Sequence, residues 1–157
     1  MALFRVGMEV IGMIQETLEK CLGGRNDAFN LCVAWLDLVA FYDDLIDKDQ
    51  PLTDEDIHHG MWCALVSMPR NPFYRQFFDV LNPLVMNSIA NWRVANRMEA
   101  VPEHLNISFI IRSSYADLVQ MCALLMFGQP AAELAGIEMR KLVHSEDFDE
   151  YKKEFGA

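Results

Sequence analysis

The sequence predicts an all-α protein, folded as a single-domain antiparallel helix bundle over residues 1–157. Apolar residues recur at intervals of three and four in the long segments, and no segment alternates polar and apolar residues over the length of a strand. The helical segments are long and the turns between them are short, which places consecutive helices antiparallel. Hydrophobic residues make up 52% of the chain, enough for one sizeable core.

The N-terminal part of the chain predicts two long helices. Residues 3–22 carry apolar side chains on one face, and a Gly-Gly pair ends this helix. The second helix begins near Asp27 and runs to about Asp47. It is apolar on nearly all sides except at Asp37, so we expect it to lie at the centre of the bundle.

The middle of the chain predicts a short helix and a long one. Thr53 and Asp56 form a variant capping box that opens a helix through about Ser67. A loop is expected at Met-Pro-Arg-Asn-Pro. Residues 72–99 then follow a helical pattern, with a break or kink expected at the Asn-Pro pair that ends in Pro83.

Two further helices close the predicted bundle. Residues 105–127 form a second strongly apolar helix, which contains the charged residues Arg112 and Asp117. Residues 131–144 form an amphipathic helix. The remaining acidic and basic residues are expected to form a frayed tail.

Charge and composition exclude several classes of protein. The formal net charge is −10 and no local basic patch is present, which argues against nucleic acid as a partner. No window provides the roughly 18 uncharged apolar residues of a membrane span. The cysteines stand singly in apolar segments, as reduced and buried cysteines of intracellular proteins do. We therefore expect a cytoplasmic protein without a membrane span, and a homo-oligomer is compatible with these features. The cysteines are Cys21, Cys32, Cys63 and Cys122.

Three carboxylates are grouped at the C-terminus of the second predicted helix: Asp43, Asp44 and Asp47. The helix dipole makes each acid there unfavourable by roughly 0.3–1 kcal/mol, and like charges four residues apart add a few tenths. The group is therefore either a solvated acidic turn or a site for a cation. Mg²⁺ is the cation that such hard oxygen ligands favour, commonly together with substrate phosphates.

A polar stripe follows the helix predicted over residues 72–99. Asn87, Asn91, Ala95 and Glu99 recur every fourth residue and so share one face. In an antiparallel bundle the Glu99 end of this helix lies at the same end as the three aspartates. The plainer interpretation of such a stripe is a solvated helix face.

Together these residues resemble the class I isoprenoid (terpenoid) synthases, most closely the phytoene and squalene synthase branch. Asp43-Asp44-x-x-Asp47 matches the DDxxD metal motif of that family. Asn91-x-x-x-Ala95-x-x-x-Glu99 has the spacing of its second metal motif, with alanine where a hydroxyl residue is expected. This chain is much shorter than is usual for the family.

The resemblance implies an all-α fold in which two helices present the motifs across the mouth of a cavity. It implies that Asp43, Asp44 and Asp47 are catalytic and hold Mg²⁺, with Asn91 and Glu99 as ligands at a second site. The metal bridges the carboxylates to a prenyl diphosphate and assists departure of the diphosphate as a Lewis acid. The implied activity is that of a prenyltransferase or a terpene synthase, which transfers or cyclises the hydrocarbon.

Arg112 is a candidate substrate contact, because a guanidinium matches phosphate geometry in a bidentate manner. Asn87 and Tyr115 are further candidates for substrate binding. Arg112 is also the natural partner of Asp37, because each stands in an apolar helix and buried charges need partners. For Asp37 itself, a structural pair with Arg112 is preferred over a catalytic role.

Two histidines, His58 and His59, are expected at the surface. His58 and His59 are adjacent, so a helix cannot direct both to one metal ion. His104 approaches the predicted metal end of the bundle and is a further candidate ligand. The alternative function is that of a non-catalytic helical interaction or structural protein, in which the acidic group is only a solvated loop.

Overall fold

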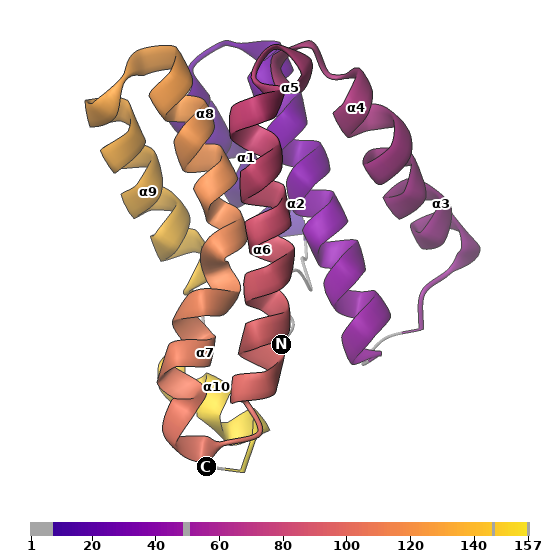
Figure 1. Cartoon of the computed structure of the whole chain (residues 1–157), viewed down its shortest axis with the longest axis vertical. Coiled ribbons are helices and arrows are strands. Elements are labelled where there is room, and N and C mark those ends of the chain that lie inside the picture. The colour runs from indigo at the N-terminus through magenta and orange to yellow at the C-terminus, as the bar shows by residue number, and fades with distance from the viewer. Residues whose placement is uncertain (1–7, 49–50, 146, 157) are drawn as a thin grey trace. The chain divides into compact units, whose positions relative to one another are not determined.

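The computed structural model describes residues 8–48, 51–145 and 147–156. These ranges contain helices and turns but no strand (Figure 1), which confirms the all-α prediction. The chain divides into two compact units, of which one ends at Phe78 and the other begins at Asp79. Each unit is described by itself below. The single domain over residues 1–157 and the antiparallel bundle as a whole stay predictions.

The first unit is built on α1 (Met8–Leu22) and α2 (Asn26–Asp47). Gly23 and Gly24 lie between them with φ of 45° and 76°, conformations that glycine adopts without steric cost. The buried faces of the two helices meet, so that Leu18 and Leu31 are fully buried. The bounds predicted for the second helix are confirmed.

The next helical segment runs back along α2 and packs against it (Figure 1). It consists of α3 (Asp54–Trp62), a π-helical turn (Cys63–Ser67) and α4 (Met68–Arg70). The predicted capping box is confirmed, because Thr53 Oγ1 accepts from the backbone N–H of Asp56 while the Asp56 carboxylate accepts from the N–H of Thr53.

The loop predicted at Met-Pro-Arg-Asn-Pro is wrong for its first part, since the helix continues through Arg70. Pro69 is tolerated because it follows the π-turn, where the helical hydrogen-bond ladder has already shifted to the bond from Met68 N–H to the Cys63 carbonyl. The chain leaves the helix at Asn71, whose amide donates to the Asp27 carbonyl at 2.7 Å and caps the next helix.

The segment predicted as one helix over 72–99 is two helices, α5 (Pro72–Gln76) and α6 (Phe78–Met98). A break at Asn82-Pro83 is wrong, because α6 is continuous through Pro83, and the interruption lies at Phe77; the kink expected there as the other possibility stays a prediction. The carbonyl that loses its N–H partner to Pro83 is that of Asp79, inside α6, so this proline does not account for the interruption at Phe77.

The second unit continues from α6 into a short 3₁₀ turn (Pro102–His104) and α7 (Leu105–Arg112). A second 3₁₀ turn (Ser113–Ala116) separates α7 from α8 (Asp117–Phe127), so the helix predicted over 105–127 is interrupted.

Two more helices complete this unit. α9 (Gln129–Val143) packs along α8 (Figure 1), and α10 (Phe148–Glu154) packs against α7. The frayed tail predicted after residue 144 is wrong, because Asp147 and Glu150 form a capping box and Tyr151 is fully buried. The Tyr151 ring lies 5.1 Å from that of Phe109, centroid to centroid.

The segment Pro102–Phe127 is long and apolar enough to cross a membrane, by length and composition alone. This differs from the expectation that no window of the sequence is long and apolar enough for a membrane span. Half of its most apolar window is buried inside the protein, and the core helix of a soluble protein has the same length and composition.

Candidate functional site

The last turn of α2 carries all three residues of the predicted DDxxD motif. Asp43 is buried, Asp44 is half-buried and Asp47 is exposed. Asp43 and Asp47 are one helical turn apart, so their Cβ atoms are about 5–6 Å apart and on the same face. The last turn of this fully described helix contains no basic side chain. The structure thus places three carboxylates, graded from buried to exposed, at one helix end.

The predicted second motif lies along α6 and ends directly after it, in the second unit. Asn87 is exposed and Asn91 is half-buried, whereas Ala95 is fully buried. Glu99 comes directly after the helix, and its backbone N–H donates to the Ala95 carbonyl at 3.0 Å. Because the two motifs belong to different units, a joint site formed with the three aspartates stays a prediction.

Glu99 lies at the centre of a buried polar network. Its Oε1 accepts from Arg112 Nη2, from the Tyr151 hydroxyl, and from Ser108 Oγ at 3.1 Å. Ser108 Oγ also lies 3.1 Å from the Ala95 carbonyl, where α7 supplies a hydroxyl beside the alanine of the motif. As a metal ligand, Glu99 would have to be shared with this network.

Arg112 is deeply buried within the same network. Its side chain is 3% exposed, and that of Glu99 is 12% exposed. Arg112 Nη2 also donates to Asn96 Oδ1 at 2.6 Å, and the guanidinium lies over the Trp92 ring at 5.1 Å from the centroid. These contacts place an opposite charge and an aromatic face against a buried charge. They support a structural role for Arg112, and its proposed contact with a diphosphate stays a prediction.

Tyr151 enters this network as a neutral donor. Its burial, followed by its hydrogen bond to Glu99, raises the pKa of the phenol to about 12. The hydroxyl therefore keeps its proton throughout the physiological range and donates to the carboxylate. Tyr151 was not predicted from the sequence, although the Asp147-x-x-Glu150 capping box has the same spacing as the box at Thr53.

Other predicted residues have separate environments. Tyr115 is buried in the 3₁₀ turn after α7, and His104 is exposed. Asp37 is exposed, and its carboxylate lies 3.2 Å from His59 Nε2. Since Asp37 and Arg112 belong to different units, the predicted pair between them stays a prediction.

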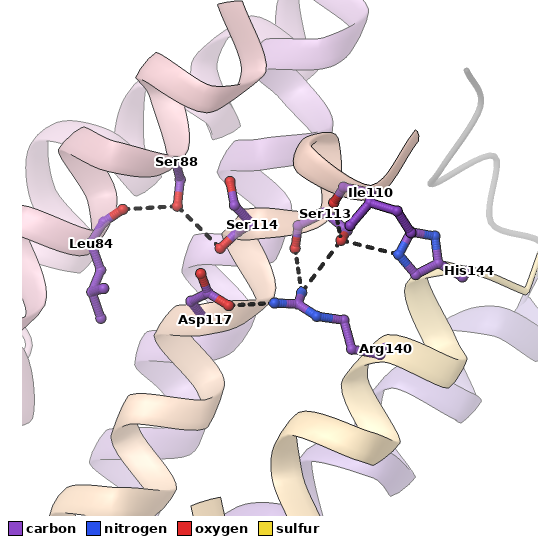
Figure 2. Close-up of polar contacts among 8 residues, drawn as sticks. All are labelled: Leu84, Ser88, Ile110, Ser113, Ser114, Asp117, Arg140 and His144. Atoms are coloured by element: carbon purple, nitrogen blue, oxygen red, sulfur yellow. Dashed lines mark hydrogen bonds and ion pairs between the residues drawn. The ribbon is translucent and has the colours of Figure 1, made fainter. Parts of the chain in front are cut away.

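A second polar cluster surrounds the 3₁₀ turn after α7 (Figure 2). Arg140 of α9 donates to the Ser113 carbonyl at 2.6 Å and pairs with Asp117. Ser88 Oγ of α6 donates to the Leu84 carbonyl at 2.8 Å and lies 3.4 Å from the Ser114 carbonyl. Arg140 satisfies a carbonyl at the point where the chain changes from α to 3₁₀ geometry. The cluster thus explains how the interruption in the predicted 105–127 helix is stabilised.

His144 belongs to the same cluster. Its Nε2 lies 3.1 Å from Ser113 Oγ (Figure 2), and its ring packs 4.6 Å from that of Phe109, between centroids. Burial, and then the positive charge of Arg140, lower the pKa of His144. The imidazole is therefore held in its neutral form, which fits a structural role.

A surface pocket of about 370 Å³ lies at the turn between α1 and α2. Its lining includes Glu19, Arg25 and Phe29. This pocket is at the N-terminal end of α2, so about 30 Å of helix separates it from the carboxylates at the other end. The hydrocarbon cavity that the resemblance implies stays a prediction.

Comparisons of the chain with models of protein families, with curated proteins and with solved structures found no significant match.

Proposed function

We propose that this protein binds a prenyl diphosphate through Mg²⁺ held by Asp43, Asp44 and Asp47. The observation that carries the proposal is the position of these three carboxylates in the last turn of α2. The motif there resembles the DDxxD motif of the class I isoprenoid synthases. Asn91 and Glu99 are the proposed ligands of a second site, and Arg112, Asn87 and Tyr115 are the proposed substrate contacts.

The donor set fits Mg²⁺. Carboxylate oxygens are hard ligands, and Mg²⁺ sites commonly use one or two carboxylates and fill the remaining positions with water and phosphate oxygens. Asp47 is exposed and Asp44 is half-buried, so this end of α2 is accessible from the solvent. Bound Mg²⁺ supplies positive charge that stabilises a leaving diphosphate. Transfer or cyclisation of the hydrocarbon is the activity proposed on this basis.

A second function, that of a non-catalytic helical interaction protein, is supported by exposed apolar side chains. Ile57, Met61, Trp62 and Leu65 follow one side of α3 and the π-turn, and Leu65 is 66% exposed. Contiguous exposed apolar side chains commonly mark a surface for another protein. On this proposal the aspartates of α2 form a solvated acidic surface.

Thermal stability distinguishes the two functions. The thermal unfolding of the parent protein and of the variant Asp43→Asn/Asp47→Asn is measured with Mg²⁺ and farnesyl diphosphate. At a hundredfold excess over the dissociation constant, a ligand stabilises the folded state by about 2.7 kcal/mol. A Mg²⁺-dependent shift that the double variant lacks supports diphosphate binding. An equal shift in both proteins, or none in the parent, contradicts it and favours the interaction protein.

A further inference from the structure

A group of three potential metal ligands lies in the first unit, away from the last turn of α2. Asp37 of α2, His59 of α3 and Cys63 of the π-turn offer one ligand atom each, and these atoms all lie within 4.8 Å of one another. His59 Nε2 lies 3.2 Å from Asp37 Oδ2 and 3.6 Å from Cys63 Sγ. The carboxylate and the thiol therefore converge on the same ring nitrogen.

The two separations from His59 Nε2 are those expected between ligands of one tetrahedral ion. Zinc bonds of about 2.3 Å to sulfur and about 2.0–2.1 Å to nitrogen and oxygen place the sulfur about 3.6 Å and the oxygen about 3.3 Å from the nitrogen. The measured distances are 3.6 Å and 3.2 Å. Without an ion, the same distances fit a hydrogen bond between Nε2 and the Asp37 carboxylate with the thiol as a weaker neighbour, so binding of the metal itself is the decisive test.

Two features of the backbone hold this group in place. An ideal Cβ at Gly60 would lie 2.2 Å from the Phe41 ring, so only glycine allows α3 to approach α2 this closely. Phe41 is one turn from Asp37, and Gly60 is next to His59, so this contact sets the distance between the two ligands. Cys63 is the first residue of the π-turn, a geometry that is rare and frequent at functional sites.

We propose that Asp37, His59 and Cys63 bind a zinc ion. An imidazole and a thiolate are ligands that suit zinc, whereas Mg²⁺ takes oxygen ligands, so this site differs in chemistry from the carboxylates of α2. The side chains of His59 and Asp37 are 58% and 45% exposed, which gives the ion access from solvent, and Cys63 closes the site from the protein side. The three ligands leave a fourth position open to solvent, as in catalytic zinc sites.

The test uses metal titration of the full chain with Zn²⁺ by calorimetry and with Co²⁺ by absorption. We expect one Zn²⁺ per chain, and a Co²⁺ complex with thiolate charge-transfer bands and the intense visible bands of tetrahedral coordination. His59→Gln and Cys63→Ser should each weaken binding by more than about a hundredfold, beyond the 10–100-fold that loss of an outer partner costs. Asp37→Asn should weaken binding without removing the thiolate bands.

His58→Gln is the matched control, because His58 is the exposed neighbour of His59 and lies outside the group. Its affinity for Zn²⁺ should equal that of the parent. His59→Gln and Asp37→Asn change exposed side chains, so both variants should fold like the parent. Circular dichroism checks that they do. Binding that is absent in the parent, that lacks thiolate bands, or that His58→Gln weakens as much as His59→Gln overturns the proposal.

Discussion

Removal of the Glu99 carboxylate tests the buried network of the second unit. The change Glu99→Leu leaves the guanidinium of Arg112, 3% exposed, without its carboxylate partner. Breaking a buried ion pair from one side costs about 3–5 kcal/mol. For a domain of about this size, each kcal/mol lowers the melting temperature by about 2–4 °C, so a fall of roughly 6–20 °C is expected. Urea unfolding followed by circular dichroism measures the free energy.

The double variant Glu99→Leu/Arg112→Met makes this prediction specific to the pair. With both charges replaced by apolar side chains, the loss should be smaller than the sum of the two single losses by about 1–3 kcal/mol. The exposed Glu103 provides the control, since Glu103→Leu should change stability by less than about 0.5 kcal/mol. A cost below about 1 kcal/mol for Glu99→Leu, or strict additivity in the double variant, would refute the buried pair.

Two further predictions concern helix packing and pH. Gly60→Ala should destabilise the first unit, because overpacking against Phe41 costs about 1–3 kcal/mol and exceeds the 0.5–1 kcal/mol that alanine gains over glycine in a helix. Gly12→Ala in α1, with open space around its Cβ, should instead stabilise, and equal effects in urea unfolding would refute the close contact. Because the folded-state pKa of His144 is lowered from its ordinary value of 6.5, the unfolded chain binds more protons as pH falls through that value. Stability should therefore be full above pH 6.5 and decline below it, and His144→Gln should flatten this part of the profile. An unchanged profile in the variant would show that His144 does not titrate differently in the folded state.

Helix periodicity and capping signals predicted the all-α character of the chain and the bounds of its second helix. The helix from Asn26 to Asp47 and the Thr53 capping box depend on local sequence, and both agree with the structure. The continuation through Pro69 was missed because it depends on the π-turn that precedes it, and the periodic pattern did not mark the interruption at Phe77.

The polar contacts were harder to foresee than the helices. Tyr151 lies 52 positions from Glu99 and 43 from Ser108 in the sequence, and only packing of α10 against α7 brings it to them. The contact between His59 and Asp37 was equally hard to foresee. His59 was expected at the surface, where the structure places it, but its distance from Asp37 depends on the close approach that Gly60 allows.

Calorimetric titration with farnesyl diphosphate tests the proposed function most directly. The parent is compared, in Mg²⁺ and in EDTA, with Asp43→Asn/Asp47→Asn and with Asp54→Asn/Glu55→Gln. The second variant removes the same two charges from exposed positions in the first turn of α3. We expect saturable, Mg²⁺-dependent binding in the parent and in the α3 variant, and its loss in the α2 variant. Binding that survives in EDTA, or that the two variants weaken equally, would contradict a magnesium site at the end of α2.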